Sequence, residues 1–109
     1  MTHRHASGTV LWPREAEVKR RVYALLRRLG CHIADLSQGR RSHVAPGLPD
    51  AYVWPPAGKP AFWYEAKSPD GKQRSEQRVF QQRCELTCVG YVLGGYTDIE
   101  AHLRTIGVL

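Results

Sequence analysis

The chain has 109 residues and carries 16 Lys and Arg against 10 Asp and Glu, which gives a net charge of +6. Its length fits one compact domain, and a hydrophobic fraction of 42% with 24% charged residues excludes a disordered tail. No stretch approaches the roughly 18 apolar residues of a membrane span, and the first residues lack the apolar segment of a secretory signal. The basic charge suits a polyanion such as nucleic acid or an acidic membrane surface, although a basic balance also occurs without such a partner.

The first half of the chain begins with an irregular lead-in, residues 1–12, followed by a single expected domain at 13–109. Pro13 stands where a helix can begin, and residues 14–29 carry apolar side chains at spacings of three and four. Gly30 ends this predicted helix. A short strand is predicted at 31–36, followed by a loop at 37–47.

The second half predicts a hairpin, because strands at 51–54 and 61–67 flank a Pro-Pro-Ala-Gly turn. A helix at 75–88 follows, with Ser75 as a plausible N-cap. A strand at 91–93 precedes a last helix that Asp98 could cap. The order α-β-β-β-α-β-α predicts an α/β fold with a mixed sheet flanked by helices.

Glu65 and Lys67 are two residues apart in the third predicted strand and therefore project from one face, roughly 6–7 Å apart. Phe62, Tyr64 and Ala66 point the other way, into a core. A carboxylate and an ammonium at a strand end, before a Pro-Asp-Gly turn, are well placed at a cleft. Taken alone, however, Glu-x-Lys is common on solvated surface strands.

Asp50 provides a second acid beside this pair. Gly47 allows a sharp turn, Pro49 favours an extended backbone, and Asp50 then begins the strand that pairs with the Glu65 strand. Asp50 and Glu65 can converge into a hard-oxygen site for Mg²⁺ or Mn²⁺, which polarises a phosphodiester and lowers the pKa of a bound water. Lys67 would orient that water or stabilise negative charge. The alternative for Asp50 is an ordinary turn aspartate.

This pattern resembles the PD-(D/E)xK nuclease signature and, more narrowly, the virus-type replication-repair nuclease (VRR-NUC) domain. In that family a Gly-x-Pro-Asp element precedes a Glu-x-Lys strand, and then come a helix that opens with a glutamine, a Gly and an apolar strand. The matching positions here are 47–50, 65–67, Gln77 and Gly90 before 91–93. The resemblance covers the chain from about residue 13 and implies a restriction-endonuclease-like fold.

The family also places a glutamate of the first helix near the metal, and this chain offers Glu15 and Glu17. Glu15 continues the apolar stripe that contains Val18, whereas Glu17 lies roughly 200° around the helix from Glu15. We expect Glu15 to join Asp50 and Glu65 as a metal ligand. The alternative is an acid at a helix N-terminus, where the helix dipole favours it.

The resemblance implies that Gln77 holds the active-site water or lysine, although an amide in the first turn of a helix needs no such role. Two loops are expected to flank the catalytic end. Their bases are the candidate phosphate contacts: Arg40, Arg41, His43, Lys72 and Arg74. Such loop cations are also common as solvated charges.

Three cysteines, Cys31, Cys84 and Cys88, are a sparse and odd set, which is typical of a reducing compartment. We therefore expect an intracellular, cytoplasmic protein. Cys84 and Cys88 could bind zinc with Cys31 and a histidine, but their spacing departs from paired zinc knuckles, and their apolar neighbours favour buried thiols.

The expected function is a metal-dependent endonuclease that hydrolyses DNA phosphodiester bonds without an organic cofactor. The resemblance extends to stand-alone phage and bacterial proteins that select branched DNA, such as four-way junctions, in replication, repair and recombination. It therefore implies a phage or bacterial protein and a homodimer, because junction cleavage needs two cuts. Two rivals are a basic nucleic-acid-binding module without chemistry and a less selective toxin or restriction DNase. The residues alone do not separate DNA from RNA.

Overall fold

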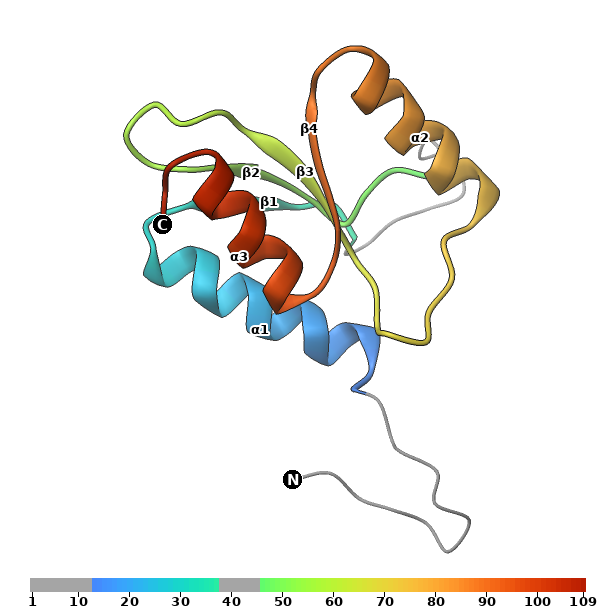
Figure 1. Ribbon diagram of the computed structural model, residues 1–109. Coiled ribbons are helices and arrows are strands. Elements are labelled where there is room, and N and C mark those ends of the chain that lie inside the picture. The colour runs from blue at the N-terminus through green and yellow to red at the C-terminus, as the bar shows by residue number, and fades with distance from the viewer. Residues whose placement is uncertain (1–12, 38–45) are drawn as a thin grey trace, which may run out of the picture.

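The computed structural model describes residues 13–37 and 46–109 and contains a four-stranded sheet flanked by helices (Figure 1). The elements in chain order are α1 (Glu15–Arg28), β1 (His32–Asp35), β2 (Ala51–Trp54), β3 (Phe62–Ala66), α2 (Ser75–Leu86), β4 (Gly90–Gly94) and α3 (Tyr96–Thr105). This order confirms the predicted α-β-β-β-α-β-α arrangement and the α/β class. The predicted lead-in at 1–12 lies outside the described residues.

The strands lie in the order β1-β2-β3-β4. β1 and β2 pair antiparallel, and so do β2 and β3, with Ala51 opposite Tyr64, which confirms the predicted hairpin. β3 and β4 are parallel, with Tyr64 opposite Val92. Parallel neighbours need a crossover connection, and α2 supplies it. The sheet is therefore mixed, as predicted.

One face of the sheet packs against α1 and α3 and forms the main core (Figure 1). Phe62, Tyr64 and Ala66 of β3 point into this core and are almost fully buried, as the alternation predicts. The Tyr64 ring meets Tyr23 of α1 edge-on, with the ring centroids 6.4 Å apart. Phe62 contacts His102 of α3 in the same way, at 4.6 Å.

The opposite face packs against α2. The Phe80 ring lies 5.1 Å from the Trp63 ring and 6.2 Å from the Tyr91 ring, centroid to centroid. Trp63 and Glu65 alternate with the core residues of β3, so Glu65 also lies beneath α2. One strand thus carries the hydrophobic core on one side and a buried acid on the other.

The N-caps of two helices differ from the predictions. α3 begins at Tyr96, and Asp98 lies inside its first turn, where the carboxylate accepts a hydrogen bond of 2.9 Å from the Gly95 N–H. α2 begins at Ser75, but Ser75 is not the N-cap; Arg74 occupies that position. In both helices the side chain of the third residue, Gln77 or Asp98, accepts a hydrogen bond from the backbone N–H of the N-cap residue. This contact is one of the two hydrogen bonds of a capping box.

The predicted end of α2 at Cys88 is also wrong, since the helix stops at Leu86. The Thr87 hydroxyl donates to the Arg83 carbonyl at 2.7 Å, and Cys88 adopts a positive φ of 58°. A left-handed residue ends the helical hydrogen-bond ladder. Within the described ranges no helix is long and apolar enough to cross a membrane.

Candidate metal centre

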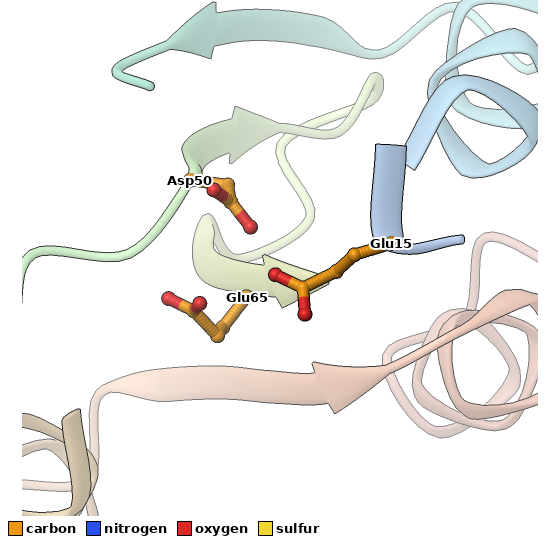
Figure 2. A group of neighbouring side chains, drawn as sticks. All are labelled: Glu15, Asp50 and Glu65. Carbon is orange, nitrogen blue, oxygen red and sulfur yellow. The ribbon is translucent and has the colours of Figure 1, made fainter. Parts of the chain in front are cut away.

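Three carboxylates from separate elements meet beside the ends of β2 and β3. One oxygen from each of Glu15, Asp50 and Glu65 lies within 4.8 Å of the others. Figure 2 shows the three side chains pointing toward a common space from the start of α1, the entry to β2 and the last residues of β3. The residues that the sequence singled out as metal ligands are therefore brought together.

Asp50 is held in place by both neighbouring strands. Its Oδ2 accepts a hydrogen bond of 2.8 Å from the Ala66 N–H, and its carbonyl oxygen accepts one of 2.7 Å from the Leu36 N–H. The chain enters through Gly47, whose φ is +79°. A Cβ on Gly47 would collide with the Glu76 carbonyl oxygen of α2, so glycine is required for this approach.

Glu65 is only 3% exposed, and Gln77 of α2 holds its carboxylate. The Gln77 Nε2 donates to Glu65 Oε2 across 2.7 Å. The Gln77 Oε1 accepts from the Arg74 N–H at 2.8 Å and so caps the helix. The contact with Glu65 is one that the resemblance did not imply, and the implied role of Gln77 toward a water or the lysine stays a prediction.

Glu15, the first residue of α1, is the helical acid that joins the group. Glu17 lies outside it and pairs with Arg20 at the surface, at 3.7 Å. The Glu15 side chain is 46% exposed, so the expectation that it continues the buried stripe of α1 is wrong. The first residue of a helix has no preceding turn to cover it, and Glu15 therefore meets solvent at the edge of the sheet.

Lys67 directly follows β3, and its side chain pairs with Glu15. Its Nζ is 3.7 Å from Glu15 Oε2, and its side chain is only 13% exposed. Its backbone N–H donates to the Gly94 carbonyl at 3.1 Å, which extends the pairing of β3 with β4 by one residue. The ammonium is thus fixed at the acidic group by both its backbone and its ion pair.

Burial, with a smaller contribution from the carboxylates, raises the pKa of two tyrosines nearby. Burial, with the charge of Glu65, raises the pKa of Tyr91 to about 12. Burial, with the charge of Asp50, raises the pKa of Tyr64 far above its usual value. Both shifts reflect a buried region in which the electrostatic potential is negative. A divalent cation bound there would offset the negative charge.

Lys19 belongs to this region, although it was not singled out from the sequence. It lines a cavity of about 220 Å³ together with Glu15 and Asp50. Its Nζ donates to the Ser37 hydroxyl at 2.7 Å, and that hydroxyl donates to Asp35 at 2.6 Å. The signal available in the sequence was spacing, because Lys19 is one helical turn from Glu15 and shares its face.

Of the predicted phosphate contacts, Lys72 and Arg74 are exposed on the segment between Lys67 and Gln77. The other three lie outside the described residues: Arg40, Arg41 and His43. Cys84 is a buried thiol, as its apolar neighbours predicted, and Cys31 is buried too. The same prediction is wrong for Cys88, which is exposed because it lies beyond the end of α2. Across residues 13–37 and 46–109, no cysteine belongs to a group of metal-ligating side chains.

The donor set fits a hard divalent cation. Carboxylate oxygens without thiol or imidazole suit Mg²⁺ or Mn²⁺. Two oxygens on one Mg²⁺ lie at most about 4.2 Å apart, since each bond is about 2.1 Å. The observed 4.8 Å is slightly wider, and a small rotation of exposed Glu15, or a bridging water, would close the difference.

Comparisons of the chain with protein families, curated proteins and solved structures gave no match.

Proposed function

We propose that the chain is a metal-dependent endonuclease that hydrolyses DNA, with the site arrangement of the VRR-NUC domain in the PD-(D/E)xK superfamily. One observation carries the proposal. Glu15, Asp50 and Glu65 converge within 4.8 Å, while Lys67 is ion-paired to the same group. A structural role alone does not require three carboxylates to gather, because like charges at this distance repel.

The side chains have separable tasks. A Mg²⁺ or Mn²⁺ ion bound by the three acids would supply polarisation of the phosphodiester and activation of water. Lys67 would donate to oxygen atoms that gain negative charge during hydrolysis. Gln77 keeps the Glu65 carboxylate at the centre of the group. Asp50 is oriented by the Ala66 N–H, which leaves its other oxygen for the cation.

DNA is the proposed substrate class, and branched DNA the preferred form. The net charge of +6 favours a polyanion, and exposed Lys72 and Arg74 lie on the segment next to Lys67. A homodimer would present two such sites for the paired cuts that a junction needs. Val79 and Leu86 of α2 are 51% and 83% exposed and form a candidate apolar surface for it.

The deciding experiment incubates purified chain with labelled four-way junction, flap, single-stranded and plain duplex DNA, each with Mg²⁺, Mn²⁺ or EDTA. Glu65→Gln is compared with Glu76→Gln, a matched change on an exposed residue of α2. We expect metal-dependent cutting in the wild type and in Glu76→Gln. Glu65→Gln, which removes the charge but keeps the shape, should be inactive.

Other outcomes separate the rivals. Tight binding without cutting on all four substrates contradicts the nuclease and indicates a binding module. Equal cutting of all four indicates a less selective DNase of the toxin or restriction kind. Faster cutting of an RNA strand than of the same DNA sequence overturns the choice of DNA.

A further inference from the structure

A second cavity, of about 620 Å³, is lined by residues from the starts of α1 and α3 and from the segment after β3. Figure 1 shows these three segments close together. Pro69, Leu93 and Tyr96 supply apolar and aromatic wall, and Arg21 and Lys67 supply positive charge. Pockets of this size are large enough to enclose most of a small organic ligand. An apolar chamber with cations at its walls suits a flat heterocycle that carries a phosphate.

The cavity adjoins the candidate metal centre at Lys67. That side chain lines the cavity and also lies 3.7 Å from Glu15 of the acidic group. A DNA strand with one phosphate at the acidic group would therefore place a neighbouring nucleotide beside the cavity. Asp98 is part of the lining too, but its Oδ2 is engaged by the Gly95 N–H at 2.9 Å. One oxygen of the Asp98 carboxylate is thus occupied by the hydrogen bond at the start of α3.

We propose that this cavity binds the base of one unpaired nucleotide next to the scissile phosphate. The inference rests on the proposed nuclease function and specifies its substrate. Tyr96, the first residue of α3, is 36% exposed and offers its ring to stack on the base. Arg21 contacts the phosphate of the same nucleotide, and Lys67 lies between base and scissile bond.

An unpaired base is required because a base inside a duplex is already stacked and paired. Moving a paired base into a cavity requires breaking its pairing and stacking, and the cost is least for a base that is already single-stranded. The cavity therefore selects DNA with an unpaired or easily frayed nucleotide at the cutting position. Branch points, flaps and single strands meet this condition, whereas intact duplex does not.

The test measures binding in EDTA, so that cleavage cannot interfere. A fluorescein-labelled single-stranded DNA oligonucleotide and its duplex are titrated with the full chain by fluorescence anisotropy. Tyr96→Ala should weaken single-strand binding about tenfold, the loss of one stacked base, and leave duplex binding within about twofold. Tyr96→Phe keeps the ring and should bind normally. Trp54→Ala is the matched control. It removes another exposed aromatic residue, which lies at the end of β2 that is farther from Asp50.

Arg21→Gln provides a second, independent variant on an exposed residue of α1. It should weaken single-strand binding and reduce the slope of log affinity against log salt by about one. Circular dichroism melting verifies that each variant folds as the wild type does.

The inference is overturned if Tyr96→Ala binds the single strand as the wild type does, or loses single strand and duplex equally. A larger Tyr96 effect with RNA than with DNA of the same sequence overturns the choice of DNA. Failure of the nuclease proposal looks different, because the wild type then cuts nothing with Mg²⁺ or Mn²⁺ while the Tyr96→Ala binding defect persists. Normal cutting with unaltered Tyr96→Ala binding rejects the cavity alone.

Discussion

The side-chain amide of Gln77 joins the start of α2 to the candidate metal centre. Its Nε2 donates to Glu65 Oε2 at 2.7 Å, and its Oε1 accepts from the Arg74 N–H at 2.8 Å. Both Gln77 and Glu65 are almost completely buried, at 4% and 3% exposure. One amide thus satisfies a helix terminus and orients an acid, so changes to it should affect both stability and activity.

Gln77→Ala should lower the free energy of unfolding by about 1–3 kcal/mol, because it leaves buried polar groups without a partner. Metal-dependent cleavage should fall on the order of 10–100-fold, the usual effect of losing a group that orients a metal ligand. Urea denaturation and cleavage rates measure the two effects.

Gln81→Ala is the control for that change, one turn further along α2. Its amide accepts from Gln73 in a half-buried contact and donates to Glu85 at the surface, so removing it should cost less, about 0.5–1 kcal/mol. Cleavage should be unchanged. Equal losses in Gln77→Ala and Gln81→Ala would show that Gln77 has no special link to the site.

The two acids of the first helical turn give a second test. Glu15→Gln should reduce cleavage on the order of 10–100-fold and raise the metal concentration needed, because Glu15 faces Asp50 and Glu65. Glu17→Gln should leave both unchanged, since its partner is surface-exposed Arg20. Cleavage rates across a Mn²⁺ titration compare them, and a defect in Glu17→Gln alone would contradict the assignment.

Two glycines with left-handed backbones differ in what surrounds them. Gly58 has a φ of +70° and nothing within 4 Å of the position of a Cβ, so Gly58→Ala should cost about 1–2 kcal/mol from backbone strain alone. Gly47→Ala adds a collision with the Glu76 carbonyl of α2 and should cost about 1–3 kcal/mol more.

Because Gly47 leads into Asp50, its substitution should also slow cleavage at temperatures where the chain stays folded, whereas Gly58→Ala should not. Thermal melts and cleavage rates of the two variants settle this. Equal melting temperatures would mean that the segment before β2 moves away from α2 without cost.

The sequence predicted most of the fold because its signals are local. Apolar spacing in α1 and alternation in β3 depend on neighbouring residues, and both were confirmed. Helix ends were harder. Asp98 caps α3 from inside its first turn, and Cys88 lies beyond α2, since side-chain hydrogen bonds and a positive φ set those limits.

At the site, residue types could be predicted but their partners could not. Asp50 and Glu65 were recognisable from a turn and a strand, and hairpin pairing brings them close. The contact of Gln77 with Glu65 depends on how α2 crosses the sheet, which no local pattern encodes. The spacing of Lys19 from Glu15 was a local signal that we did not use, whereas its contact with Ser37, 18 residues away in the chain, could not be predicted locally.

Metal binding should stabilise the fold, and this gives a prediction that does not depend on cleavage. Three carboxylates within 4.8 Å repel one another, and a bound cation removes that repulsion. A site filled at 100 times its dissociation constant adds about 2.7 kcal/mol to the free energy of unfolding. For a domain of this size that corresponds to a rise in melting temperature on the order of 10 °C.

Differential scanning fluorimetry in Mn²⁺ and in EDTA measures this rise, and Asp50→Asn should abolish it. The asparagine keeps an oxygen that can accept from the Ala66 N–H, so the apo fold should be retained. Asp70→Asn is the matched control, because Asp70 is exposed in a turn and bonds to Ser68. It should retain the full rise. A shift that survives in Asp50→Asn would place the cation elsewhere on the chain.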